Sequence, residues 1–222
     1  MGAERWATFD CYGTLIDWET GIGGALGKLW PGRDRTRLLA RYHQVEPSIQ
    51  AAGAIPYREV MARALRTIAE SEGESLRAGD EGALGDSLPG WPVFPEVPGA
   101  LDELQARGWR LAILSNTDPD LLAASIRRIG VAPDMTITAT DAGSYKPAHG
   151  HWERFRERSG AEPGRHVHVA ASLFHDIAPA SELGIRAVWI NRQGESSRLP
   201  RAAELFDLSK LPSTLERLVP QE

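Results

Sequence analysis

The chain has 222 residues and a formal net charge of -5 at pH 7, and hydrophobic residues make up 42% of it. This composition is too apolar for a disordered chain, and no apolar run reaches the ~18 residues of a membrane span. The N-terminus lacks the apolar stretch of a signal peptide, and the single cysteine, Cys11, excludes an intrachain disulfide framework. We therefore expect a cytoplasmic protein with a buried core, no membrane contact and no broad nucleic-acid surface.

The first predicted element is a short buried strand over residues 6–9. This apolar run ends at Asp10 and is followed by a turn that contains Gly13, a pattern typical of a strand inside a sheet. Asp10 is then expected at the carboxyl end of the strand, the edge at which open α/β sheets bind ligands.

Residues from 17 to about 90 are predicted to be helical. Apolar side chains recur at helical spacing over 36–50 and again over 57–70. Pro47 is expected to kink the first of these helices or to end it early. Four prolines within residues 89–98 exclude a continuous helix there and indicate a stiff connector.

After the connector, strands and short helices alternate. Strands are predicted at 109–114, 135–139, 166–169 and 185–190, and helices at 99–107, 121–129, 151–159 and 178–183. Such alternation indicates parallel βαβ units. We therefore predict an α/β fold: a doubly wound parallel-sheet core, residues 1–16 and 95–222, with a helical cap, residues 17–94, inserted after the first strand.

Polar side chains gather at the predicted ends of several strands, in the segments 10–14, 115–117, 144–147 and 171–176. In a parallel sheet these segments converge at one edge. Asp10 and Asp176 would contribute carboxylates there, and Lys146 an ammonium that favours the ionised form of Asp10. Ser115 and Asn116 would donate hydrogen bonds to an anion. Such a site can perform covalent catalysis by a carboxylate.

The ordered motifs Asp-x-Tyr-Gly-Thr-Leu (10–15), Leu-Ser-Asn (114–116) and Tyr-Lys-Pro (145–147) resemble those of the haloacid dehalogenase superfamily. The similarity is greatest to the type II L-2-haloacid dehalogenases and extends from Phe9 to about Arg192. It implies a Rossmann-like core and metal-independent hydrolysis of short 2-haloalkanoic acids, through an aspartyl ester, to a 2-hydroxy acid and halide. It also implies a small anionic substrate and suggests a homodimer.

The resemblance further implies roles for individual residues. Asp10 matches the nucleophile, Thr14 a residue that positions it, Lys146 the lysine beside it, and Asp176 the acid that helps to activate water. Arg41 resembles the cap arginine, whose guanidinium can grip a carboxylate or halide. The expected substrate-binding residues are Arg41, Ser115, Asn116, Tyr12, Trp152, His175 and Ser172.

Two positions distinguish the chain from the superfamily's magnesium-dependent phosphatases. Those enzymes carry an acid two residues after the nucleophile and another before the final aspartate, where this chain has Tyr12 and Ala171. Because Mg²⁺ needs several hard oxygen ligands, we expect no cofactor. The last motif also departs from that of the dehalogenases, at Leu173 and His175. A phosphatase with Mg²⁺, a hydrolase of another small carboxylate and a non-catalytic protein of this fold are therefore the alternatives.

Three further patterns are interpreted as structural. Strand alternation turns Cys11 away from the face of Asp10. The pair His166 and His168 lacks the companion ligands that a zinc site requires. Ser172, His175 and Asp176 are close in sequence, which does not supply the hydrogen-bonded chain of a catalytic triad, although His175 is a candidate base for ester hydrolysis.

Overall fold

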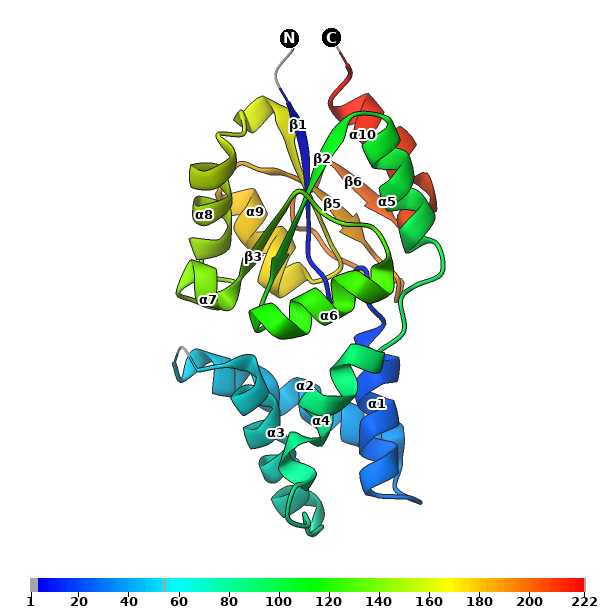
Figure 1. Cartoon of the computed structure of the whole chain (residues 1–222), viewed down its shortest axis with the longest axis vertical. Coiled ribbons are helices and arrows are strands. Elements are labelled where there is room, and N and C mark those ends of the chain that lie inside the picture. The colour runs from blue at the N-terminus through cyan, green and yellow to red at the C-terminus, as the bar shows by residue number, and fades with distance from the viewer. Residues whose placement is uncertain (1–3, 54, 222) are drawn as a thin grey trace.

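A parallel sheet forms the centre of the computed structural model, which describes residues 4–53 and 55–221. Within them the strand order is β3-β2-β1-β4-β5-β6, and every neighbouring pair is parallel (Figure 1). The strands are β1 Arg5–Phe9, β2 Trp109–Ser115, β3 Met135–Thr138, β4 His166–Ala170, β5 Arg186–Ile190 and β6 Ala203–Leu205. Asp10 follows the central strand β1, so it lies at the middle of the sheet's carboxyl edge.

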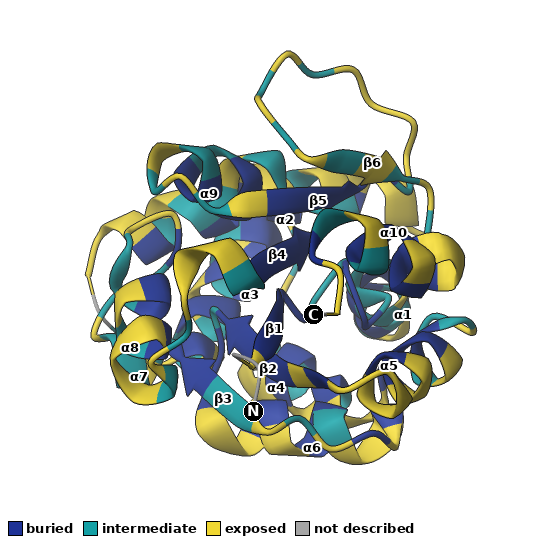
Figure 2. Cartoon of the chain, turned by 90° about the horizontal axis from the view of Figure 1, so that it is seen from above, coloured by how far each residue is buried: buried dark blue, intermediate teal, exposed yellow. Residues whose placement is uncertain are grey.

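Side chains on the two faces of the sheet pack against different helices. Alternate side chains of β1 pack on opposite faces of the sheet. Ala7 and Phe9 belong to one hydrophobic cluster, and Trp6 belongs to another. The first layer contains α5 Val97–Ala106, α6 Pro119–Ile129 and α10 Leu211–Leu218; the second contains α8 Gly150–Ser159 and α9 Ala178–Glu182. Figure 2 shows the buried strands between helices whose outer faces are exposed. The predicted doubly wound α/β fold is confirmed.

Four more α-helices of the described chain gather beyond the carboxyl ends of the strands, apart from the sheet (Figure 1). They are α1 Trp18–Leu29, α2 Arg35–Ala51, α3 Tyr57–Glu72 and α4 Ala83–Ser87; we call residues 18–90 the helical layer. Asp34 caps α2 by accepting hydrogen bonds from the backbone N–H groups of Thr36 and Arg37. The division of the chain at 17 and 94 into two domains stays a prediction.

Two adjacent segments connect the helical layer to the sheet. Ile16 forms an antiparallel bridge with Val93. The backbone N–H of Asp17 donates to the carbonyl of Pro92 at 2.8 Å, and that of Phe94 donates to Leu15 at 3.1 Å. Residues 15–17 and 92–94 are therefore joined by backbone hydrogen bonds, next to the turn that carries Asp10.

Several elements differ from the predictions. Helix α2 does not end at Pro47 but continues to Ala51, so the expectation of an early end is wrong. Strand β6 and helix α10 had not been predicted. The last motif adopts one π-helical turn, Leu173–Ile177, before α9 begins. Within the described part of the chain, none of the helices has the length and apolarity needed to traverse a bilayer.

Candidate active site

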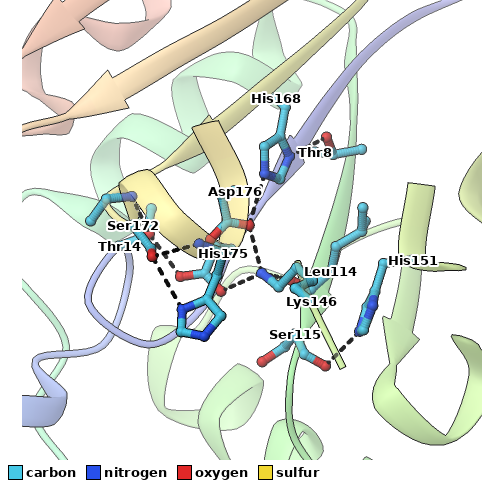
Figure 3. Close-up of polar contacts among 12 residues, drawn as sticks. Thr8, Thr14, Leu114, Ser115, Lys146, His151, His168, Ser172, His175 and Asp176 are labelled. Atoms are coloured by element: carbon cyan, nitrogen blue, oxygen red, sulfur yellow. Dashed lines mark hydrogen bonds and ion pairs between the residues drawn. The ribbon is translucent and has the colours of Figure 1, made fainter. Parts of the chain in front are cut away.

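Lys146 lies at the centre of the polar side chains at the carboxyl edge of the sheet (Figure 3). Its Nζ donates hydrogen bonds to Asp10 Oδ1 at 2.8 Å, Asp176 Oδ1 at 2.7 Å and the Leu114 carbonyl at 2.9 Å. Burial opposes the charge, but the two aspartates outweigh it and raise the pKa of Lys146 above its ordinary value. The ammonium is thus fixed between two carboxylates with all three of its protons in use.

The turn after β1 positions Asp10. Thr14 Oγ1 donates to Asp10 Oδ2 at 3.0 Å and accepts from the backbone N–H of Ala171, also at 3.0 Å. Thr14 therefore joins the turn after β1 to the last motif. Burial raises the pKa of Asp10, and the charge of Asp176 adds to this, whereas Lys146 and Thr14 act in the opposite direction. Asp10 is 7% exposed and lines the cavity.

Asp176 occupies a different environment, although it shares the same lysine. Its Oδ1 also lies 3.0 Å from His168 Nε2. Burial alone would raise the pKa of Asp176, but Lys146 and His168 outweigh burial and hold it below its ordinary value. Its Oδ2 is buried and has no hydrogen-bond partner in the described part of the chain. Asp176 is thus the more readily ionised of the two acids, and it has a free acceptor.

A buried chain of hydrogen bonds extends from Asp176 into the sheet. Thr8 Oγ1 lies 2.9 Å from His168 Nδ1 and 2.8 Å from His166 Nε2. An ionised carboxylate can only accept, which places the proton of His168 on Nε2. His168 Nδ1 then accepts from the Thr8 hydroxyl, and the Thr8 oxygen accepts from His166. The two histidines therefore support Asp176 rather than bind zinc.

A cavity of about 720 Å³ opens beside Asp10, between the sheet edge and the helical layer. Asn116 lines it, but its side-chain amide bonds the backbone N–H and carbonyl of Lys146, at 2.7 and 3.0 Å. Ser115 also lines it, and its buried Oγ has no partner among the described residues. Of this pair, Ser115 has the free donor for an anion, and Asn116 positions Lys146.

Three more of the expected binding residues, Tyr12, Ser172 and His175, line the cavity. The Tyr12 hydroxyl lies 3.0 Å from Ser125 Oγ. Ser172 Oγ lies 3.2 Å from His175 Nδ1, but Asp176 bonds Lys146 and His168 instead of His175. These residues therefore do not form a catalytic triad. Burial lowers the pKa of His175, so its imidazole is neutral at pH 7.

Two expected binding residues do not reach the cavity. Arg41 donates to Ser71 Oγ and Gln44 Oε1 and lines a separate hollow formed by α2 and α3. Trp152 is 2% exposed in the core between α8 and the sheet, edge-on to His168 at 5.3 Å. The expected placement of both side chains is therefore wrong. Each lies on a helix face that is turned away from the cavity.

Several residues that shape the site were not predicted from the sequence. From the helical layer, Trp18, Glu46 and Tyr57 line the cavity. Glu46 follows Tyr42 by one helical turn, a spacing that could have revealed a shared buried face. His168 alternates with His166 on β4, which places both rings on one face of the sheet, beside Thr8.

Magnesium does not fit the residues at this site. The two acids at the sheet edge, Asp10 and Asp176, are both engaged by Lys146, and the positions of the phosphatase acids hold Tyr12 and Ala171. Across residues 4–53 and 55–221, no cluster of three or more His, Cys, Asp or Glu side chains suits a metal ion. Mg²⁺ requires more hard oxygen ligands than this arrangement offers.

Comparisons with known proteins agree with the fold and the order of the motifs. A family model described as haloacid dehalogenase-like hydrolase matches residues 5–184. (S)-2-haloacid dehalogenase 1 of Pseudomonas sp. (strain CBS-3) is 30% identical over 98% of this chain and 99% of its own length. The (S)-2-haloacid dehalogenase of Pseudomonas sp. (strain YL) is 30% identical over 84% of this chain and 82% of its own.

A solved structure gives the same result for the fold. The L-2-haloacid dehalogenase from Xanthobacter autotrophicus, with chloropropionic acid covalently bound, has a TM-score of 0.85 at 19% identity. The match covers 96% of this chain and 98% of that one. The family resemblance inferred from the motifs is confirmed, and the chain belongs to the haloacid dehalogenase-like hydrolase family.

Proposed function

We propose that this protein hydrolyses the carbon–halogen bond at C2 of short 2-haloalkanoic acids through an ester on Asp10. The observation that carries this proposal is the contact of Lys146 Nζ with Asp10 Oδ1 at 2.8 Å, in a site where Tyr12 replaces the second acid of a phosphatase. A phosphatase needs that acid to protonate its leaving alkoxide. A halide leaves as a stable anion and needs no proton. The names of the 30%-identical relatives support the same reaction.

In the first step, a carboxylate oxygen of Asp10 attacks C2 from the side opposite the halogen. The carbon–oxygen bond forms as the carbon–halogen bond breaks, and the halide leaves with the bonding electron pair. C2 is thereby inverted. Thr14 and Lys146 hold the two oxygens of Asp10, so the nucleophile is oriented before the substrate enters.

Water then cleaves the ester. We assign the orientation of a water molecule to the unpartnered Oδ2 of Asp176, and the acceptance of a proton from that water to His175, whose pKa burial lowers. Attack on the Asp10 carboxyl carbon gives a tetrahedral intermediate, whose bond to the substrate oxygen then breaks. That oxygen takes the proton held by His175 and leaves as the hydroxyl of the 2-hydroxy acid, and the Asp10 carboxyl group loses its remaining proton to solvent. Lys146 stabilises the negative charge that develops on the carbonyl oxygen of the Asp10 ester.

The free hydroxyl of Ser115 is the group that we assign to the substrate carboxylate, since Arg41 lies outside the cavity. No metal takes part in this mechanism, because Lys146 supplies the positive charge between the two acids. The small anionic substrate, the cytoplasmic location and the homodimer remain predictions.

A halide-release screen tests the proposal. Purified protein should release halide from 2-chloropropionate or bromoacetate in the presence of a chelator, and Asp10→Asn should abolish it. Mass spectrometry of the quenched reaction should find the substrate-derived ester on the peptide that contains Asp10. Magnesium-dependent release of nitrophenol from nitrophenyl phosphate, without halide release, would instead support the phosphatase.

A further inference from the structure

The helical layer places a buried acid in the wall of the cavity. Glu46, on α2, is 6% exposed and lines the cavity. The hydroxyls of Tyr57 and Tyr42 donate to its Oε1 at 2.6 and 3.3 Å, and the Gln50 side chain also hydrogen-bonds to it. Burial raises the pKa of Glu46 above its ordinary value, and the hydrogen bonds from Tyr57, Tyr42 and Gln50 act in the opposite direction. Glu46 is thus held as an acceptor beside the space where a substrate would lie.

No described residue of that wall provides a counter-ion for Glu46. Of the side chains that the helical layer contributes to the cavity, His43 is the only basic one. It stacks on Trp18 with ring centroids 4.8 Å apart, and burial lowers its pKa, so it is neutral at pH 7. Arg41, which was expected to supply the positive charge, lines the separate hollow formed by α2 and α3.

The cationic side chains on the opposite wall are already engaged. Lys146 bonds two aspartates, and Arg192 pairs with Glu96 at 2.7 Å. A buried carboxylate without a paired cation is costly. The structure therefore satisfies hydrogen bonds of Glu46 but provides no cation beside it among the described residues, and a bound ammonium group would offset the burial that raises the pKa of Glu46.

The size and composition of the cavity fit a ligand that reaches Glu46. Its volume of about 720 Å³ lies within the usual range for small-molecule sites, and a three-carbon acid at Asp10 would fill only part of it. Trp18 and Tyr57 line the wall next to Glu46. Aromatic rings together with a carboxylate are the combination that recognises ammonium groups.

We propose that Glu46 is a specificity-determining residue that binds an ammonium group on the substrate chain, so that the substrate class is amino-substituted 2-halo acids. This inference rests on the proposed function at Asp10 and specifies its substrate. The competing view is that Glu46 only ties α2 to α3 through Tyr42 and Tyr57. The two views differ in what Glu46→Gln does to substrate preference.

A matched pair of substrates provides the test. 6-Amino-2-chlorohexanoate and 2-chloroheptanoate have the same number of non-hydrogen atoms, and only the first ends in an ammonium. For the wild type, kcat/KM for chloride release should be higher with 6-amino-2-chlorohexanoate than with 2-chloroheptanoate. Glu46→Gln should lower the ratio of the two kcat/KM values by about tenfold or more, as expected for loss of a desolvated charge partner.

Two control variants separate charge from packing. Tyr42→Phe removes the longer of the two tyrosine hydrogen bonds to Glu46 but leaves the carboxyl group and its Tyr57 partner in place, so the ratio should be retained. Glu70→Gln makes the same charge change on the exposed face of α3, away from the cavity, and should alter neither rate. If the wild type shows no preference, or if Glu46→Gln reduces both rates equally, the inference is overturned while the dehalogenase proposal stands.

A binding measurement distinguishes failure of the inference from failure of the proposed function. 6-Aminohexanoate should raise the Tm of the wild type more than heptanoate does, and Glu46→Gln should remove the difference. This result without halide release from either chloro acid would support the ammonium site and refute the dehalogenase chemistry. Equal Tm shifts for both ligands would refute the ammonium site.

Discussion

At the scale of single residues, Asp176 depends on side chains that never reach the cavity. His168 donates to it, and Thr8 and His166 fix the tautomer in which His168 can do so. Side chains on one face of the sheet thus help to keep Asp176, at the edge of the sheet, ionised. Residues that carry no reacting atom should therefore alter the pH dependence of the reaction.

We expect Thr8→Val to change the pH profile of ester hydrolysis. Without the Thr8 hydroxyl, His168 loses the donor that keeps its proton on Nε2, and the hydrogen bond to Asp176 weakens. The pKa of Asp176, which His168 helps to hold low, should rise. The acid limb of kcat should move to higher pH, whereas kcat at neutral pH should be retained, because Asp176 stays ionised there.

Thr8→Ser is the matched control, because it keeps a hydroxyl at the same position and should restore the wild-type profile. The pH dependence of kcat for halide release, measured for all three proteins, decides the matter. A Thr8→Val profile that overlays the wild type would show that the buried chain has no influence on Asp176.

At the scale of elements, the orientation of helices explains the errors in the predicted site. The buried face of α2 contains Leu38, Tyr42 and Val45, and its helical spacing is readable from the sequence. Arg41 lies about 100° from Tyr42 around the helix, at the edge of that face, and its side chain extends to Ser71 and Gln44. Sequence periodicity identifies an inward face, but not which part of that face meets the cavity.

Close packing of α1 against Trp91 gives a second prediction at this scale. A Cβ at Gly21 would lie 2.3 Å from the Trp91 ring, whereas one at Gly24, a turn further along, would meet nothing within 4 Å. Gly21→Ala should therefore destabilise the protein by about 1–3 kcal/mol through overpacking. Gly24→Ala should stabilise it by about 0.5–1 kcal/mol, because alanine is the better helix former.

Urea unfolding of both variants beside the wild type provides the comparison. The opposite signs matter more than the magnitudes, since both substitutions add one methyl group to the same helix. Equal stability changes for the two variants would mean that α1 does not approach Trp91 as closely as the structure indicates.

At the scale of the whole molecule, the sequence predicts the sheet better than it predicts the site. Buried parallel strands such as β2 and β5 are apolar runs, and the acids and lysine at their ends converge because every strand points the same way. Strand β6 was not predicted, because a strand of three residues that are all at least partly exposed is too short to show a hydrophobic pattern. Trp152 and Arg41 were misplaced because their positions depend on tertiary packing.

The buried histidines predict how the stability of the molecule varies with pH. Burial, and then His168, lowers the pKa of His166 to about 3. The unfolded chain, with a histidine pKa of about 6.5, binds a proton that the folded state excludes, so stability falls as pH drops below that value. His166 alone should cost about 2 kcal/mol between pH 7 and pH 5.

His166→Gln isolates this effect, because an amide can still donate to Thr8 but does not titrate. The free energy of unfolding, measured in urea at pH 7, 6 and 5, should decline less steeply for the variant than for the wild type. Parallel declines would assign the acid sensitivity of the protein to other groups.

The two segments that join the helical layer to the sheet enter and leave side by side, bonded through Ile16 and Val93. An insertion whose two ends are adjacent need not disturb the fold of the domain that contains it, since a short turn could connect the same two positions. The sheet and the turn after β1 thus form a scaffold that could accept different helical insertions. Transplanting residues 17–92 between relatives becomes a direct route to changing which molecules reach Asp10.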